Sequence, residues 1–224
     1  EGKTEEEIRT YMQKTYFASD EKIDLSIDIA ERELEILKKI DYENGYSLYI
    51  GIPFCPTTCL YCSFTSYPLV SWRQKVDSYL DALEKELDYV AVKFGKKHLN
   101  SIYIGGGTPT TLEPYQLDRL IRKIRCSFDL SHCLEFTVEA GRPDSITREK
   151  LETLKKWDIT RISINPQTMK DETLKIIGRR HTVAQTVESF QLARELGFDD
   201  INMDLIMGLP EESLEDVRDT LEQV

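Results

Sequence analysis

The sequence predicts an α/β domain that is built on a parallel sheet and preceded by a helical segment. From residue 46 onward, short runs rich in β-branched and aromatic residues alternate with longer amphipathic stretches. This alternation is typical of parallel strands joined by right-handed helical crossovers. The runs are almost continuously apolar, as expected for strands whose faces are covered by helices. Each run ends in a polar or glycine-rich segment, which places candidate ligand-binding residues at the carboxyl edge of one sheet.

Residues 1–45 are expected to form a helical segment, the tail of an N-terminal region. Two stretches, 5–17 and 21–40, carry apolar residues at helical spacing with charged residues between them. The sequence lacks an initiator Met, and its last amphipathic stretch, which begins near Ser213, continues to the final residue without a stop signal. We therefore expect a fragment of a longer protein.

Residues 46–224 are expected to form the main domain from five consecutive strand–loop–helix units. The strands are predicted at residues 47–52, 101–104, 134–138, 161–164 and 201–206. The helices are predicted at residues 72–94, 114–124, 147–157, 171–177 and 183–196, and from Ser213 onward. Gly197 follows the fifth helix, at a position where glycine commonly ends a helix.

The composition argues against several classes of protein. The 224 residues carry a formal net charge of −11, which disfavours nucleic-acid binding because that binding rests on cationic neutralisation of phosphate. No apolar run approaches the roughly 18 residues of a membrane span, and the acidic N-terminus is unlike a secretory signal. The five cysteines are odd in number and three are crowded together, which does not suit a disulfide framework. We therefore expect a cytoplasmic protein in a reducing environment.

Three cysteines, Cys55, Cys59 and Cys62, follow the first strand in one loop with the spacing C-x3-C-x2-C. Pro53 and Pro56 prevent this loop from continuing as strand or helix. Three thiolates indicate a soft metal site, and a set of three leaves one position for a substrate. Iron–sulfur chemistry with one open iron is the preferred interpretation. A structural zinc ion is the alternative, and its fourth ligand would come from Cys126, Cys133, His98, His132 or His181.

None of those five alternative ligands has finger-like spacing. We otherwise interpret the three histidines as structural or surface residues and the two cysteines as inert thiols. Gly105, Gly106 and Gly107 stand together after the second strand and are followed by Thr108. Consecutive glycines are entropically costly, so we expect them to let a ligand approach the backbone closely. The segment lacks the Gly-Lys-Ser/Thr ending of a phosphate loop.

Polar side chains stand at or near the ends of the later strands. Glu139 is a candidate acceptor for a cationic amine, and Gln167 and Asp204 are suited to hydroxyl groups or an amine. Asp204 lies in an apolar run, where a carboxylate needs a partner. Arg179 and Arg180 form either a surface pair or a bidentate partner for a carboxylate.

The cysteine motif, with Tyr61 just before its last cysteine, resembles the cluster motif of the radical S-adenosylmethionine (radical SAM) enzymes. The resemblance extends in order to the oxygen-independent coproporphyrinogen III dehydrogenase family, whose motifs are matched at residues 49–55, 105–109, 177–181 and 204–210. The amino-acid sequences of residues 51–68 and 164–168 resemble those of the HemZ branch of this family. That branch carries an extra N-terminal region, which would end in residues 1–44.

The resemblance implies a partial (β/α)6 radical SAM barrel, of which five βα units are present and the last would lie beyond Val224. Cys55, Cys59 and Cys62 would ligate three irons of a [4Fe–4S] cluster, whose fourth iron takes the amino and carboxylate groups of S-adenosylmethionine (SAM). The residues implied to contact SAM are Tyr49, Tyr61, Gly106, Gly107, Thr108, Glu139, Gln167, Arg179 and Asp204. Among them, Tyr61 would lie near the adenine and the Gly106–Thr108 segment near the methionine part.

The resemblance also implies a reaction of haem biosynthesis. One-electron cleavage of SAM yields a 5′-deoxyadenosyl radical, which takes a hydrogen atom from a propionate of coproporphyrinogen III. Loss of carbon dioxide and one electron then leaves a vinyl group. A low-potential donor such as flavodoxin or ferredoxin would supply the electron, and neither nucleic acid nor membrane is an expected partner.

The sequence departs from the family pattern at two positions. Gly51 stands where many relatives have His, and Phe64 stands where the best-known dehydrogenases have a further Cys. A close relative within the family is a haem chaperone without oxidase activity. A haem-trafficking protein on the same scaffold is therefore the alternative function.

Overall fold

The computed structural model describes residues 2–64 and 66–224. The chain divides into two compact units, Glu1–Gly45 and Tyr46–Val224. Within the residues described, no helix is both long enough and apolar enough to cross a lipid bilayer.

The first unit consists of two helices, α1 (Glu5–Tyr16) and α2 (Asp20–Leu37). The side chain of Ser19 accepts a hydrogen bond from the first turn of α2, which satisfies one of the free N–H groups of that helix end. Ile23 at the start of α2 is completely buried, whereas Leu34 and Ile36 near its end are each 57% exposed. Helical periodicity thus predicts both helices, although it does not predict how much apolar surface each one buries.

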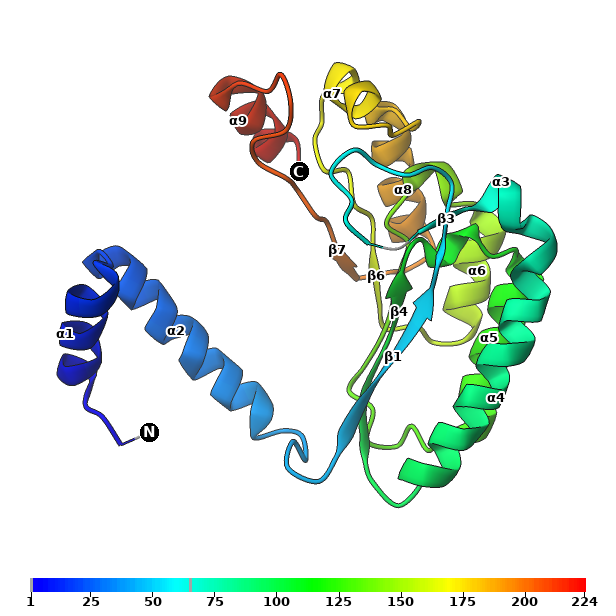
Figure 1. Cartoon of the computed structure of the whole chain (residues 1–224), viewed down its shortest axis with the longest axis horizontal. Coiled ribbons are helices and arrows are strands. Elements are labelled where there is room, and N and C mark those ends of the chain that lie inside the picture. The colour runs from blue at the N-terminus through cyan, green and yellow to red at the C-terminus, as the bar shows by residue number, and fades with distance from the viewer. Residues whose placement is uncertain (1, 65) are drawn as a thin grey trace. The chain divides into compact units, whose positions relative to one another are not determined.

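The second unit is organised around a five-stranded sheet (Figure 1). The strands are, in spatial order, β1 (Tyr46–Ile52), β4 (Leu99–Gly106), β5 (Glu135–Glu139), β6 (Arg161–Ser163) and β7 (Asp200–Asn202). Every neighbouring pair is parallel, which confirms the predicted α/β fold. A small second sheet pairs β2 (Phe54–Cys55) with β3 (Tyr67–Pro68), one strand on each side of the cysteine loop.

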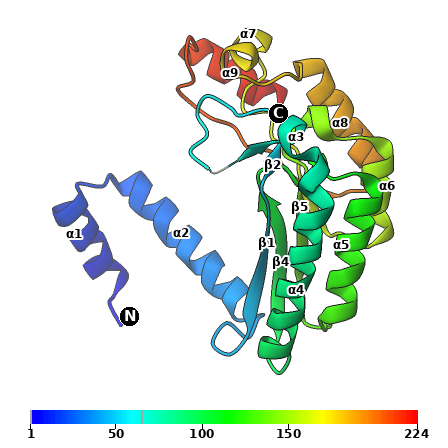
Figure 2. The same ribbon diagram turned by 45° about the vertical axis from the view of Figure 1, so that its right-hand side comes forward.

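Helical segments follow the strands and complete the βα units. The helices are α3 (Leu69–Trp72), α4 (Val76–Phe94), α5 (Pro114–Ser127), α6 (Arg148–Lys156), α7 (Asp171–Ile176), α8 (Val183–Glu195) and α9 (Leu214–Gln223). Three short 3-10 helices in the described residues are η1 (Arg73–Lys75), η2 (Pro109–Thr111) and η3 (Pro143–Ser145). Figure 2 shows α4, α5 and α6 side by side along one face of the sheet.

The main hydrophobic core lies between the sheet and these helices. Ile102 and Ile104 of β4 and Leu117 and Ile121 of α5 are completely buried within it. Burying one such side chain stabilises the fold by about 1.5–3 kcal/mol. The core therefore holds the strands rigidly, and the cysteine loop, cyan in Figure 1, lies at their carboxyl ends.

Three predicted elements need correction. The helix predicted over 72–94 is interrupted, since α4 begins only at Val76, after α3 and η1. Strand β4 is longer than predicted and includes Gly105 and Gly106, which pair with β1. The strand predicted over 201–206 is wrong in its second half, because β7 ends at Asn202. Strand β7 pairs only with the short strand β6 in the described sheet, so no second neighbour extends it.

Candidate functional site

A cavity of about 340 Å³ opens at the carboxyl ends of the strands. Cys55, Cys59 and Cys62 line one side of it. Eight of the nine residues predicted to contact SAM also line it, namely Tyr61, Gly106, Gly107, Thr108, Glu139, Gln167, Arg179 and Asp204. The structure therefore brings together residues that are separated by up to 149 positions in the sequence, from Cys55 to Asp204.

Tyr49 is the predicted residue that lies outside this cavity. Tyr49 is 62% exposed, and its ring stacks on that of Tyr103, with 5.6 Å between ring centroids. Tyr49 lines a neighbouring cavity of about 250 Å³, which shares Phe64, Gly106 and Gly107 with the first. The two cavities are thus adjacent, and the glycine segment forms part of the wall of each.

The end of β4 holds the first half of the cysteine loop through backbone hydrogen bonds. The N–H of Gly107 donates to the carbonyl of Ile52 at 2.7 Å, and the N–H of Thr108 donates to the carbonyl of Phe54 at 2.8 Å. Pro53, which lies between Ile52 and Phe54, has no backbone N–H and cannot donate a hydrogen bond to a neighbouring strand. The loop therefore leaves the sheet here but remains fastened to its neighbouring strand.

The segment after α7 holds the second half of the loop. The N–H of Leu60 donates to the carbonyl of Ile177 at 2.9 Å, and the hydroxyl of Thr57 donates to the carbonyl of Gly178 at 3.0 Å. Gly178 has φ +78, and a Cβ there would lie 3.2 Å from the carbonyl oxygen of Thr58. A glycine suits this position because it accepts the left-handed conformation and leaves room for the loop.

The glycines at the end of β4 and just after it make room for the protein's own backbone. A Cβ on Gly107 would lie 2.7 Å from the carbonyl oxygen of Phe54 and 2.9 Å from Sγ of Cys55. Gly106 has φ +106, and a Cβ there would lie 3.1 Å from backbone atoms of Ile52. Gly106 and Gly107 thus leave room for the end of β1 and the start of the cysteine loop, and the approach of a ligand to them stays a prediction. Both glycines also line the cavity.

The three loop cysteines are partly buried free thiols. Burial raises the pKa of the Cys55 thiol, and the hydroxyl of Thr108 donates a hydrogen bond to Sγ of Cys55 at 3.6 Å. Among the described residues, no group of three or more His, Cys, Asp or Glu side chains is arranged to hold a metal ion. A [4Fe–4S] cluster presents its irons at separate corners, so its thiolates bind different atoms and need not converge on one point. Three soft sulfur donors that face one cavity fit such a cluster.

The alternative fourth ligands of a zinc site, Cys126, Cys133, His98, His132 and His181, do not line this cavity. Cys126 is exposed, and the rings of His98 and His132 stack on each other at 3.9 Å. His181 is 3% exposed, and burial lowers its pKa to about 4. Of the two interpretations offered for His181, structural and surface, the structure excludes the surface position.

Glu139 ends β5 as a partly buried carboxylate on the cavity wall. Burial raises its pKa to about 7, and the nearby carboxylate of Asp204 contributes to this rise. A hydrogen bond from the N–H of Gly106 acts in the opposite direction. A cation placed next to this side chain would favour its charged form, so the site is suited to an ammonium group.

Arg179 is buried, and its guanidinium joins three separate segments. It donates to the carbonyl of Asn165 at 2.7 Å and to the carbonyl of Gly141 at 3.2 Å. It also donates to the phenolic oxygen of Tyr61 at 2.9 and 3.1 Å. Arg179 thus ties the ends of β5 and β6 to the cysteine loop, whereas its neighbour Arg180 is exposed.

Gln167 and Asp204 face the cavity from the β6–β7 side. Gln167 has φ +69, an uncommon conformation for a side chain with a Cβ. Its backbone is fixed there by bonds to the carbonyl of Asp204 at 3.0 Å and from the N–H of Ile206 at 2.9 Å. The Asp204 carboxylate has the partner that its apolar run required, the side-chain amide of Asn202 at 2.8 Å, yet it is exposed.

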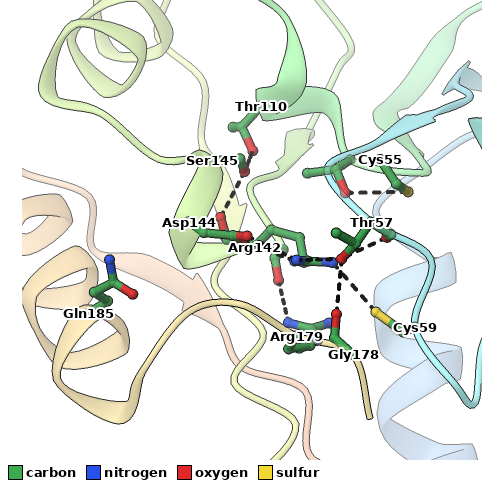
Figure 3. Close-up of polar contacts among 12 residues, drawn as sticks. Cys55, Thr57, Cys59, Thr110, Arg142, Asp144, Ser145, Gly178, Arg179 and Gln185 are labelled. Atoms are coloured by element: carbon green, nitrogen blue, oxygen red, sulfur yellow. Dashed lines mark hydrogen bonds and ion pairs between the residues drawn. The ribbon is translucent and has the colours of Figure 1, made fainter. Parts of the chain in front are cut away.

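Sequence reasoning missed several residues of this cavity, and two of them, Arg142 and Asn165, are buried polar side chains. Arg142 is buried, and its guanidinium reaches the cysteine loop (Figure 3). Asn165 is buried as well, and its side-chain oxygen accepts from the N–H of Asp204 at 3.2 Å. Both residues stand just after a predicted strand, and that placement was the available signal.

The comparison with protein-family models identifies the fold unit. A model described as the radical SAM superfamily matches residues 49–224. Among solved structures, coproporphyrinogen III oxidase (HemN) from Escherichia coli superimposes with a TM-score of 0.74 at 32% identity, over 84% of this chain and 43% of that one. The residues matched by the family model include the cysteine loop and every residue that lines the cavity.

Curated relatives carry two kinds of name. The chain is 44% identical over 227 residues to the oxygen-independent coproporphyrinogen-III oxidase-like protein HemZ of Bacillus subtilis, covering 99% of this chain and 45% of that protein. It is 45% identical over 172 residues to the heme chaperone HemW of the same organism, covering 75% of this chain and 44% of HemW. The chain thus spans less than half the length of these relatives. It belongs to the radical SAM superfamily, and within it to the group of proteins that contains HemN, HemZ and HemW.

Proposed function

We propose that this chain is the cluster- and SAM-binding part of an enzyme that oxidatively decarboxylates a coproporphyrinogen. The observation that carries the proposal is the single cavity that gathers three cysteines and the ends of the parallel strands. Radical SAM proteins use a [4Fe–4S] cluster and SAM, and the donors on the cavity wall suit both. In this assignment Cys55, Cys59 and Cys62 ligate three irons and leave the fourth to SAM.

The remaining cavity residues are suited to the polar parts of SAM. Glu139 is the acceptor for the ammonium group, because a cation relieves the charge repulsion between Glu139 and Asp204. The Gly106–Thr108 segment offers close backbone approach next to the cysteine loop. Tyr61 presents an aromatic face whose position is fixed by Arg179. Tyr49, in the adjacent cavity, is assigned to the outer end of the same ligand or to the substrate next to it.

When bound, the cluster and SAM supply hydrogen-atom abstraction. The chain's own residues hold the reactants and exclude water from the buried side of the cavity. Arg179 and Arg142 keep the cysteine loop against the strand ends, and the core behind β4 and β5 keeps those ends in place. Substrate selection belongs to parts of the whole protein as well as to this chain, since the chain spans under half of its relatives.

A haem chaperone on the same scaffold is the second candidate function. The similarity to HemW, 45% over 172 residues, is as high as the similarity to HemZ, although it spans less of this chain. The two functions share cluster and SAM residues and differ in what happens to a tetrapyrrole. For either function we infer that the protein lies in the reducing cytoplasm and accepts electrons from a low-potential carrier such as flavodoxin or ferredoxin. We also assign residues 1–45 to the end of an N-terminal region and residues 46–224 to a barrel that continues in a sixth βα unit.

The two functions are separated by one assay on the full-length protein, loaded anaerobically with iron and sulfide. A decarboxylating enzyme is expected to release 5′-deoxyadenosine and carbon dioxide only when coproporphyrinogen III is added. The control is the Cys59→Ala variant, which should retain its fold but lose its iron. Stoichiometric haem binding without turnover would instead establish the chaperone. A wild-type protein that binds zinc and takes up no iron would contradict the cluster assignment.

A further inference from the structure

Arg142 is a buried cation whose side chain points at the cysteine loop. Its side chain is only 4% exposed. One guanidinium nitrogen lies 3.5 Å from Sγ of Cys59, and the same nitrogen lies 3.4 Å from the carbonyl oxygen of Thr57. The other terminal nitrogen donates to the hydroxyl of Thr57 at 3.1 Å. Figure 3 shows the guanidinium between these loop residues and the Asp144 carboxylate.

Asp144 balances most of this buried charge. Its two carboxylate oxygens accept from the guanidinium at 2.9 and 3.0 Å, in a bidentate pair. Asp144 itself is 15% exposed, so the pair as a whole is shielded from water. Burying an ion pair gains little stability, because the loss of hydration offsets the attraction between the charges. The placement of this pair against a thiol therefore points to a role other than stability.

The backbone of Arg142 is held in place independently of its side chain. Its carbonyl accepts from the N–H of Ser145 at 2.9 Å and from the hydroxyl of Ser145 at 2.7 Å. The Ser145 hydroxyl lies 2.6 Å from the hydroxyl of Thr110, and buried Lys150 donates to the carbonyls of both residues. The guanidinium thus starts from a fixed base, and its direction toward Cys59 is built into the fold.

We propose that Arg142 is a positioning residue that donates a hydrogen bond to the Cys59 thiolate and raises the reduction potential of the cluster held there. This inference rests on the proposed cluster site. Hydrogen bonds to the sulfurs and net charge nearby are two of the properties that set the potential of an iron–sulfur cluster. A cation next to Cys59 favours the reduced form, which carries one more negative charge. Asp144 opposes this effect and sets its size.

The proposal predicts shifts of opposite sign for the two members of the pair. Arg142→Gln removes the cation, so the midpoint potential should fall. A tenfold weaker uptake of one electron from the reductant corresponds to about 59 mV, and a shift of that order is expected. Asp144→Asn leaves the guanidinium uncompensated, so the potential should rise. Arg142→Lys keeps the charge and one donor, and should restore most of the wild-type value.

The experiment is a redox titration of the full-length protein, loaded with iron and sulfide and followed by electron paramagnetic resonance without SAM. Arg122→Gln is the matched control, because Arg122 is exposed on α5 and pairs only with Asp118 in the described structure. Its potential should equal that of the wild type. A merely structural role of the pair would loosen the loop in both variants and move their potentials in the same direction, or not at all. Either result overturns the proposal.

Two further outcomes are also decisive. If Arg142→Gln takes up no iron, the comparison is made between Asp144→Asn, whose potential should rise, and Arg142→Lys, whose potential should stay near the wild-type value; equal potentials in these two variants overturn the proposal. If the wild-type protein takes up no iron, the cluster site fails together with this inference. Wild-type iron content without opposite shifts rejects only the role of Arg142. The two failures are thereby distinguished.

Discussion

The ends of β4 and β7 carry similar sequence patterns and lie in different surroundings. Each follows an apolar run, and each leads into a glycine, Gly107 after β4 and Gly208 after β7. Strand β4 has a neighbour on both sides, and Ile102 and Ile104 within it are fully buried. Strand β7 has only β6 beside it in the described sheet, and Ile201 remains partly exposed. A local pattern therefore predicts a strand, whereas its neighbours decide how deeply it is buried.

The largest difference is expected between alanine substitutions at these two glycines. Gly107→Ala places a Cβ 2.7 Å from the carbonyl oxygen of Phe54, and overpacking of this kind costs about 3 kcal/mol. The loop must shift, so cluster uptake should also fall sharply. Gly208→Ala meets no atom within 4 Å and loses stability only through its φ of +80, about 1 kcal/mol.

Urea unfolding measures both costs, provided that the slope with denaturant stays the same. Equal losses in the two variants would show that backbone conformation, and not the approach of the cysteine loop, explains the glycines.

A second difference is expected between the adjacent arginines. Arg179→Gln removes a buried guanidinium that bonds the carbonyls of Gly141 and Asn165, and leaving such buried groups unsatisfied costs about 2 kcal/mol. Arg180→Gln changes an exposed side chain and should alter stability by less than about 0.5 kcal/mol. Thermal and urea unfolding of the two variants give the comparison. Similar losses would mean that Arg179 does not join the strand ends to the loop.

A third effect, no larger than the second, concerns the charge repulsion between Glu139 and Asp204 at the ends of neighbouring strands. The pKa of Glu139 is raised to about 7 from 4.5, so the folded protein binds this proton more tightly than the unfolded chain. The resulting stabilisation is present below pH 4.5 and is lost as the pH rises through 7. Glu139→Gln cannot lose a proton, so its free energy of unfolding should not fall over this pH range. At pH 8 the difference from the wild-type change should reach at most about 2 kcal/mol, a figure reduced for the partial exposure of the Glu139 side chain.

Asp204→Asn supplies the matched change on the β7 side. It removes one cause of the raised pKa of Glu139, so that pKa should be lower than in the wild type. The loss of folding stability with rising pH should therefore be smaller, and it should be complete at a lower pH. Free energies of unfolding at about pH 5, 6, 7 and 8 test both variants. A wild-type profile in Asp204→Asn would show that burial alone sets the Glu139 pKa.

The parallel α/β fold and most of the cavity can be predicted from the sequence. Strand ends in a parallel sheet meet at one edge, so strand positions alone are enough to group Glu139, Gln167 and Asp204. The position of a residue along a strand does not reveal which of two adjacent cavities its side chain lines. Tyr49 accordingly lines the smaller cavity next to the one that holds the cysteines. Arg142 escapes such reasoning because its partners, Thr57 and Cys59, are more than 80 residues away.

The contacts of the cysteine loop also determine when it takes shape. The loop occurs early in the chain, yet its backbone is fastened to Gly107 and Thr108, to Arg142 and to the segment 177–178. Closing such long stretches of chain costs entropy, and contacts of high sequence separation form late in folding. We therefore expect the three thiols to stay open to solvent until the chain has folded through Gly178. During synthesis, the cysteines would be exposed to iron and to oxidants well before the cavity that shelters them exists.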